Sequence, residues 1–225
     1  MHNDILVDSK KRIDISVIRG YLYIVFKRTF DVICSLFGCI LLLPIMLVIK
    51  IASLITKDYD SIIFTQDRIG KDGKTFRLYK FRSMISNADE VLNNLLETDE
   101  DAREEYRVNK KLAHDPRITK LGNFIRKTSI DELPQLINIL KGDMSFIGNR
   151  PYLPREKDDM GIYYNDIIKT RPGLTGYWQV SGRSDTTFEE RLKLEKKYSN
   201  MANLKLDIKI FFKTFKVVLC KDGAK

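Results

Sequence analysis

The segment that most restricts how this chain can fold is an uncharged, strongly apolar run at residues 32–49, VICSLFGCILLLPIMLVI. The run is close to the length of about 20 residues that a helix needs to cross a membrane. It begins too far from the N-terminus to be a cleaved signal peptide, and no cleavage site of small residues follows it. The sequence therefore predicts a membrane-associated helix, for which three arrangements are open.

Pro44 and the flanking charges separate these arrangements. A buried helix of a soluble protein would be unusually apolar on all sides, and a single membrane span would hold a proline in its interior. The positive-inside tendency favours the cytoplasmic side for cationic flanks. Cations flank the run on both sides, at Lys27, Arg28, Lys50 and Lys57. A re-entrant helix, broken at Pro44 and returning through the same leaflet, explains both the proline and the cations on the two sides better than a single span does. The single span remains an open alternative.

The composition narrows the class of partner. The chain has 39 Lys and Arg against 30 Asp and Glu, and its formal net charge of +9 indicates nucleic acid, an anionic membrane surface or phosphorylated substrates. The 3 cysteines lie in apolar stretches, so we expect reduced thiols in a chain that faces the cytoplasm. Neither histidine has a Cys or His neighbour at metal-ligand spacing, which argues against zinc.

Residues 61–84 have the pattern of a β-hairpin. Two arms of apolar and aromatic residues flank a turn at residues 71–74, and the second arm interleaves aromatic residues with cations. This arm fits either single-stranded nucleic acid binding or a half-buried strand with a solvated basic face. The highly charged residues 87–111 predict a surface helix pair.

Two adjacent carboxylates, Asp131 and Glu132, precede an apolar stripe with helical spacing. The stripe is formed by Leu133, Leu136, Ile137 and Leu140. We expect the two carboxylates at the N-terminus of that helix, where the dipole favours anions. Ser129 and Glu132 fit a capping box, but Pro134 would then lie past the first turn. Taken alone, the stretch favours capping over catalysis.

Two loops rich in glycine and arginine follow. The first places Arg150 after a short apolar run, and the second spans residues 171–183, with Arg171 and Arg183 at its ends. Such loops commonly bind phosphate, although a cluster of structural turns is an equal alternative. Near the C-terminus, residues 204–219 combine an apolar face with a lysine stripe. This pattern fits a helix in an anionic membrane interface or a core-facing helix.

Together these features indicate a phosphorylated, lipid-linked substrate. Cations exceed carboxylates around Asp131 and Glu132 in the sequence. A carboxylate can attack phosphorus, and a hard cation such as Mg²⁺ can offset the charge that develops. Six motifs then resemble one family, the bacterial sugar transferases, which are monotopic phosphoglycosyl transferases. They are FTQDRIGKDGKTF at 64–76, YKFRSM at 79–84, DPRIT at 115–119, DELPQL at 131–136, KGDMSFIG at 141–148 and RPGLTGYWQVSGR at 171–183.

The resemblance implies the chemistry and its residues. Asp131 attacks the β-phosphate of a UDP-sugar and UMP leaves. Undecaprenyl phosphate then takes the sugar-phosphate, which starts the assembly of an exopolysaccharide or capsule. Glu132, with Asp131, is associated with Mg²⁺. Arg126, Lys80 and Arg150 match substrate-binding positions, and we expect Arg171 and Arg183 to contact phosphate as well.

The chain departs from the family at two positions. A Ser-Pro pair breaks the family's membrane helix, whereas Leu43 precedes Pro44 here; we expect the break to persist on Pro44. The family's Pro-Arg-Pro is Asn149-Arg150-Pro151, which keeps the arginine but questions the conformation of its loop. Larger members carry additional transmembrane helices, so the chain resembles the minimal catalytic form.

The expected architecture is α+β and predominantly helical, with a small hairpin and interfacial amphipathic helices. We expect a polar lead at residues 1–26, a re-entrant membrane helix at 27–57 and a catalytic domain at 58–225 on the cytoplasmic face of the bacterial inner membrane. The expected partners are a UDP-sugar, undecaprenyl phosphate and anionic lipids, without nucleic acid. Whether the protein is a monomer or a homodimer stays open, as does the sugar. A peripheral membrane or nucleic-acid adaptor is the alternative function.

Overall fold

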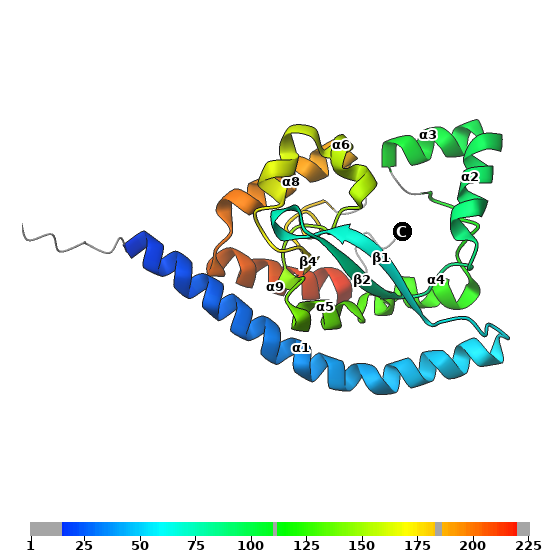
Figure 1. Cartoon of the computed structure of the whole chain (residues 1–225), viewed down its shortest axis with the longest axis horizontal. Coiled ribbons are helices and arrows are strands. Elements are labelled where there is room, and N and C mark those ends of the chain that lie inside the picture. The colour runs from blue at the N-terminus through cyan, green and yellow to red at the C-terminus, as the bar shows by residue number, and fades with distance from the viewer. Residues whose placement is uncertain (1–14, 110–111, 183–185, 220–225) are drawn as a thin grey trace, which may run out of the picture.

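One long helix lies along the whole underside of the protein (Figure 1). A computed structural model describes residues 15–109, 112–182 and 186–219. Helix α1 spans Ile15–Ile55 and is followed by a helical body with two small sheets of two strands each. The predicted α+β class with mostly helical structure is confirmed.

The predicted break at Pro44 does not occur, because the helix continues through that residue. Helix α1 begins at Ile15 and continues through Pro44 as one helix of 41 residues. It bends instead, with its convex side turned away from the body (Figure 1). A proline removes one backbone donor and bends a helix, but neighbouring turns can hold the helical path. The segment Gly20–Ile55 is long and apolar enough to cross a membrane by length and composition.

The N-terminal half of α1 packs on the body through polar groups. The Arg28 guanidinium donates to the Ile139 and Leu140 carbonyls, at 2.6 and 2.9 Å. The buried Asp31 accepts hydrogen bonds from the Ser145 hydroxyl and the Phe146 amide, at 3.1 and 3.0 Å. These contacts fix the helix against the body because a buried polar group without a partner would be costly.

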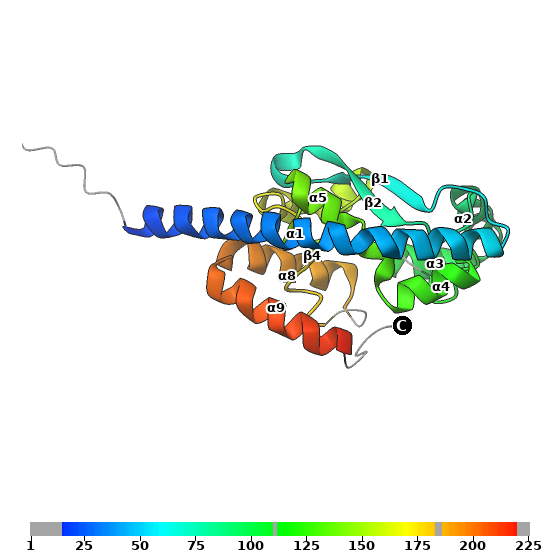
Figure 2. The same ribbon diagram turned by 90° about the horizontal axis from the view of Figure 1, so that it is seen from below.

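The C-terminal half of α1 packs through apolar side chains. Leu42 and Ile49 belong to one buried cluster with Phe81 and Ile125 of the body. The body therefore covers one side of α1 in both halves, and Figure 2 shows the helix crossing the lower face from one end to the other.

The predicted hairpin is confirmed. Strands β1 (Ile63–Ile69) and β2 (Thr75–Phe81) pair antiparallel around a 3-10 turn, η1 (Lys71–Gly73). Asp72 in that turn has a φ of 57°. Two of the cations of the second arm have partners within the chain: Lys80 pairs with Glu132, and Arg82 with Asp58. These contacts favour the half-buried strand as the explanation of the basic arm.

The predicted surface helix pair is present as α2 (Ala88–Thr98) and α3 (Glu100–Asn109). Helix α4 (Lys120–Lys127) then begins at Thr119, whose hydroxyl caps it by accepting from the Gly122 amide. A Cβ at Gly122 would lie 1.9 Å from the Ser83 carbonyl oxygen. Glycine is therefore needed for α4 to approach the end of the hairpin this closely.

The two carboxylates precede their helix rather than begin it. Asp131 and Glu132 lie in a 3-10 turn, η2 (Ile130–Glu132), and helix α5 begins only later, at Gln135–Lys141. Ser129 has a left-handed backbone with a φ of 57°, and its side chain caps nothing. Pro134 occupies the N-cap position of α5. The capping box is therefore absent, and the expected helix start was placed too early.

The two glycine-rich loops meet in a short parallel sheet that the sequence did not predict. Strand β3 (Ser145–Ile147) pairs with β4 (Gly173–Thr175). A Cβ on Gly173 would lie 2.1 Å from the Gly148 nitrogen. The glycines thus permit direct backbone contact between the loops.

Short elements and two longer helices complete the body. They are η3 (Pro154–Glu156), α6 (Lys157–Met160), η4 (Gly161–Tyr163), α7 (Tyr164–Ile167), α8 (Phe188–Met201) and α9 (Leu204–Leu219). On α9, Ile208, Phe212 and Phe215 are exposed while Ile210 is buried. An exposed apolar face beside lysines fits the predicted interfacial helix better than a core-facing one.

Candidate active site

The end of the hairpin and the η2 turn bring a lysine to the carboxylate pair. Lys80 Nζ lies 2.9 Å from Glu132 Oε1. Directly opposite residues of an antiparallel pair project to the same face. Phe64, Gln66 and Arg68 are therefore on one face of the hairpin with their partners Lys80, Leu78 and Phe76. This face is turned toward η2.

The two adjacent carboxylates have different surroundings. Asp131 is buried, with 9% of its surface exposed, and burial raises its pKa against the opposing effects of Lys80 and Arg126. Burial also acts to raise the pKa of Glu132, but the charge and hydrogen bond of Lys80 outweigh it and the pKa falls. The pair thus combines a desolvated carboxyl with a firmly ionised one.

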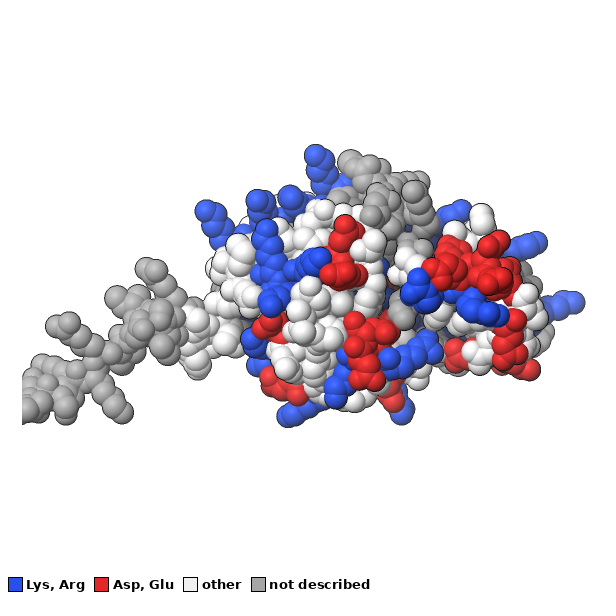
Figure 3. Space-filling view, turned by 90° about the horizontal axis from the view of Figure 1, so that it is seen from above, with Lys and Arg blue, Asp and Glu red and all other residues white. Residues whose placement is uncertain are grey.

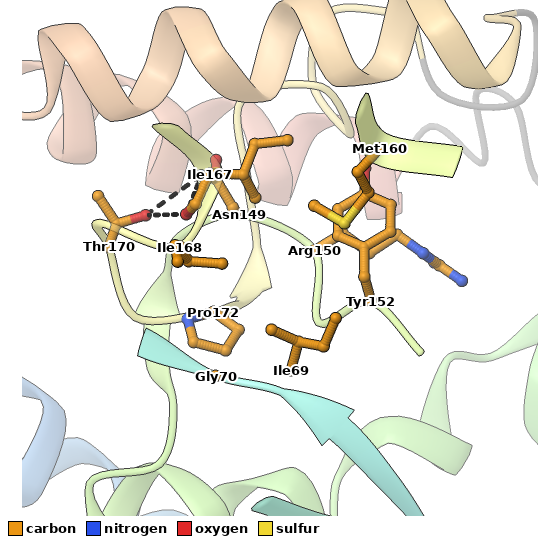
Figure 4. Close-up of a pocket in the computed structure, with 10 residues that line it drawn as sticks. All are labelled: Ile69, Gly70, Asn149, Arg150, Tyr152, Met160, Ile167, Ile168, Thr170 and Pro172. Carbon is orange, nitrogen blue, oxygen red and sulfur yellow. Dashed lines mark hydrogen bonds between the residues drawn. The ribbon is translucent and has the colours of Figure 1, made fainter. Parts of the chain in front are cut away.

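Arg150 is placed by its backbone, and its loop is held from two sides. The Arg150 amide donates to both carboxylate oxygens of Glu195, at 3.0 and 2.8 Å. The side-chain Nδ2 of Asn149 lies within hydrogen-bond distance of three acceptors, the Ile167 carbonyl and the Thr170 and Ser199 hydroxyls. In Figure 4 the Arg150 guanidinium points away from Asn149 and Thr170. Asn149 therefore fixes the loop that carries Arg150 through its side-chain hydrogen bonds.

Beyond Arg150 lies an open cavity with about 340 Å³ of empty space. Its lining includes Lys80, Glu132 and Arg150, together with three polar residues that the sequence analysis did not single out: Arg68, Gln135 and Gln179. Asp131 is not among the lining side chains and lies beside them in the chain. Every second residue of a strand points to the same face, and residues paired across the hairpin share a face. Applied from Lys80 back across the turn, this rule would have placed Arg68 on the face of the site.

The remaining predicted arginines lie in different places relative to the carboxylate pair. Arg126 is in the last turn of α4, and its charge acts to lower the pKa of both Asp131 and Glu132, although it does not line the cavity. Arg171 Nε donates to the Gly142 carbonyl, at 3.0 Å. Gly142 follows the C-terminal end of α5, and the carboxylates precede its start, so about 10 Å of helix separates them. The structure does not bring Arg171 to the pair, and Arg183 lies outside the described residues.

The carboxylate pair suits a metal that needs few protein ligands. No group of three or more His, Cys, Asp or Glu that could hold a metal occurs among the residues the structure describes. Mg²⁺ usually takes one or two carboxylates and completes its shell with water and phosphate oxygens. Glu132 uses one oxygen for Lys80, so two adjacent carboxylates with spare oxygens fit Mg²⁺ and do not form a closed cage.

The structure thus combines an exposed apolar helix, typical of membrane-associated proteins, with a cation-lined cavity beside two carboxylates. A model of one family, "Bacterial sugar transferase", matches residues 22–221. The chain belongs to the bacterial sugar transferase family, as its motifs indicated.

Several curated proteins are similar to the chain. It is 47% identical to the undecaprenyl-phosphate galactose phosphotransferase of Salmonella typhimurium, over 88% of this chain and 41% of that protein. It is 39% identical to the exopolysaccharide production protein ExoY of Rhizobium meliloti, over 88% and 87% respectively. It is 34% identical to the UDP-glucose:undecaprenyl-phosphate glucose-1-phosphate transferase of Escherichia coli, over 84% and 39%. The chain thus spans about two fifths of the first of these relatives.

Proposed function

We propose that the protein transfers a sugar-1-phosphate from a UDP-sugar to undecaprenyl phosphate, as a phosphoglycosyl transferase in exopolysaccharide or capsule synthesis. The observation that carries the proposal is the pairing of a buried Asp131 with an ionised Glu132 at a cavity lined by cations. The names of the Salmonella and Escherichia relatives support the lipid acceptor and, for the second, the UDP-linked donor.

The reaction proceeds in two displacements at one phosphorus atom. An Asp131 carboxylate oxygen attacks the β-phosphorus of the UDP-sugar, the bond from that phosphorus to the bridging oxygen breaks, and UMP leaves with the electron pair. The enzyme then carries an acyl phosphate esterified to the sugar. A phosphate oxygen of undecaprenyl phosphate attacks the same phosphorus, Asp131 leaves as a carboxylate, and undecaprenyl-diphosphate-sugar forms.

The other residues hold charge in place during both steps. Lys80 ties Glu132 to the hairpin, and Arg150 and Arg126 surround the pair with positive charge that favours a phosphate. Glu132, with Asp131, would hold Mg²⁺, which when bound neutralises negative charge on the phosphate oxygens. Arginine suits this task because its planar group can bind phosphate through two hydrogen bonds.

The apolar surface provides for a lipid substrate. Helix α1 exposes apolar side chains on the side that the body leaves free, and α9 adds Phe212 and Phe215. We place this surface in the cytoplasmic leaflet of the inner membrane, where the lysines of α9 meet anionic lipid. The undecaprenyl chain would then stay in the bilayer while its phosphate reaches the cavity.

Trapping the labelled enzyme tests the chemistry. Wild-type protein mixed with UDP-sugars carrying labelled β-phosphate should release UMP and retain the label until undecaprenyl phosphate is added. A panel of UDP-galactose, UDP-glucose and N-acetylated sugars would identify the donor. D131N should lose label and turnover by at least about 10³-fold, because an amide is not a nucleophile toward phosphorus.

The neighbouring carboxylate gives the control. E132Q should still carry some label but lose most of the Mg²⁺ dependence of the rate. Label retained by D131N and lost by E132Q would move the nucleophile to Glu132, which lines the cavity directly. Unchanged Mg²⁺ dependence in E132Q would remove its role with the metal.

A further inference from the structure

A second arginine of the hairpin reaches the cavity. Arg68 is on β1, on the same face as Lys80 and four cross-strand pairs away from it. It lines the cavity together with Lys80, Glu132 and Arg150. Only 9% of its surface is exposed, which is unusual for an arginine in a strand and requires a reason.

The hydrogen bonds of Arg68 hold its side chain without neutralising it. Nη1 donates to the Pro151 carbonyl at 3.0 Å, and Nη2 donates to Gln66 Oε1 at 2.6 Å. Both acceptors are uncharged. The buried Nε has no partner among the described residues, and Arg150 Nε is in the same condition.

The carboxylates around the two guanidinium groups are engaged elsewhere. Glu195 accepts the Arg150 amide with both oxygens, Glu156 accepts the Leu153 amide at 2.7 Å, and Glu132 accepts Lys80. Neither Arg68 nor Arg150 forms an ion pair within the described part of the chain. Burial, and then the charge of Arg150, lower the pKa of Arg68 to about 10. Arg68 is buried and Arg150 is half-buried with a buried Nε, and neither has an ion-pair partner among the described residues, which leaves a site suited to an anion.

We propose that Arg68 and Arg150 together bind one phosphate group of a substrate in this cavity, with Arg68 donating its free Nε–H to a phosphate oxygen. The inference rests on the proposed function and adds a binding residue to it. Arg68 thus adds a cation to the same cavity that Lys80 and Arg150 line beside Glu132. The phosphate comes either from the UDP part of the donor or from the lipid acceptor.

Binding of pyrophosphate to the full chain in detergent tests the site directly. The titration follows the melting temperature in EDTA, so that no metal contributes. R68Q should weaken pyrophosphate binding by about 10- to 100-fold, the loss expected for one charge-assisted hydrogen bond. R68K keeps the charge but not the planar donor group, and should weaken binding by about 10-fold.

Arg77 provides the matched control. It lies on the same hairpin, is exposed, and is directly opposite Asp67. R77Q removes the same charge from the same element and should leave pyrophosphate binding unchanged. If R68Q does not fold, the comparison of R68K with R77Q decides the question, since R68K retains the positive charge.

The two half-reactions identify the source of the phosphate. If Arg68 binds the donor, R68K should slow UMP release in the absence of acceptor by about 10-fold and leave the chase of preformed labelled enzyme unchanged. If it binds the lipid phosphate, the chase should slow instead.

Unaltered pyrophosphate affinity in both Arg68 variants would overturn the inference, as would unaltered rates in both half-reactions. Failure of the proposed function looks different. In that case wild type and R77Q would form no labelled enzyme from any UDP-sugar, while the pyrophosphate titration would still decide whether Arg68 binds phosphate.

Discussion

Asp131 and Glu132 are adjacent in the chain, yet their pKa values move in opposite directions. Lys80 contacts only Glu132, while Asp131 is enclosed by the protein. Two neighbouring groups whose pKa values are shifted apart in this way can take different roles in one reaction. The sequence predicted both residues because the motif is specific. It did not predict this division, because the division depends on Lys80, which is far from the pair in the chain.

Glu195 provides a prediction about pH at the scale of one residue. It is fully buried, and burial raises its pKa to about 8 against the Arg150 amide and the charges of Arg150 and Arg191. The folded state therefore binds a proton that the unfolded state releases near pH 4.3. The stability from this proton is complete below about pH 4.3 and is lost as the pH rises through about 8.

The E195Q variant isolates this effect because it cannot titrate. We expect the melting temperature of wild type minus that of E195Q to decrease between pH 6 and pH 9. Thermal unfolding of both proteins in parallel measures it. A difference that grows in favour of wild type as the pH rises would show that the ionised carboxylate is the stabilising form.

The arginines show how far a sequence motif can predict which side chains lie at the site. Of the predicted arginines, Arg150 lines the cavity, while Arg126 acts on the pKa of Glu132 from outside the lining. Arg171 belongs to an equally specific motif but binds the Gly142 carbonyl. Arg68 was in a quoted motif without an assigned role. A motif marks residues that matter, but whether a side chain faces a cavity or a carbonyl depends on packing across loops that are distant in sequence.

At the scale of elements, α1 shows why Pro44 alone was a weak predictor. Proline costs one hydrogen bond and disturbs the local turn, but packing can offset this. Leu42 and Ile49 are buried against the body on both sides of Pro44 and hold the helix as one element. The apolar run predicted an apolar helix in this segment, and the residues before it, YLYIVF at 21–26, continue the apolar pattern toward the helix start at Ile15.

A buried polar junction joins α1 to α9. Asp207 Oδ2 accepts Lys27 Nζ at 2.5 Å and the Tyr23 hydroxyl at 2.9 Å, and Oδ1 accepts the Tyr198 hydroxyl at 2.8 Å. Loss of one partner of a buried ion pair leaves the other charge uncompensated. We expect D207N to destabilise the protein by about 3 kcal/mol, which lowers the melting temperature by about 6–12 °C in a chain of this size.

Two further variants serve as controls for the D207N measurement. E104Q breaks the exposed pair with Arg107 and should leave the melting temperature unchanged. The double variant K27M/D207L replaces the pair by apolar groups and should recover part of the loss. A D207N protein as stable as wild type would show that Asp207 does not join the helices energetically.

At the scale of the whole molecule, charged and apolar side chains are exposed on different sides of the protein. Figure 3 views the face opposite α1, which carries acidic and basic side chains across its width, with acidic residues gathered over α2 and α3. Exposed apolar residues follow α1 on the other side and continue on α9. Extended exposed apolar patches usually mark a contact surface, which fits the proposal that this side of the protein faces the membrane.

This arrangement predicts the topology of α1. A helix of 41 residues is about 60 Å long, twice the about 30 Å of a hydrocarbon core. The body covers α1 in both halves, through Arg28 and Asp31 in the first and Ile49 in the second, so a body on one side of the membrane favours both ends on that side. The bend then lets the middle of α1 enter the leaflet. We therefore expect a helix that does not span.

Cysteine labelling in intact cells measures this. The probes are G20C and Y59C at the two ends of α1, with I162C on the body as the reference, in a chain whose Cys34, Cys39 and Cys220 are replaced by alanine. Ile162 is 81% exposed and lies on η4, away from α1, and a Cβ at Gly20 meets nothing within 4 Å. All three probes should resist a membrane-impermeant reagent until the cells are opened, because all three lie on one side. Labelling of G20C from outside, with Y59C and I162C protected, would instead establish that α1 crosses the membrane and that its packing on the body differs from the structure described.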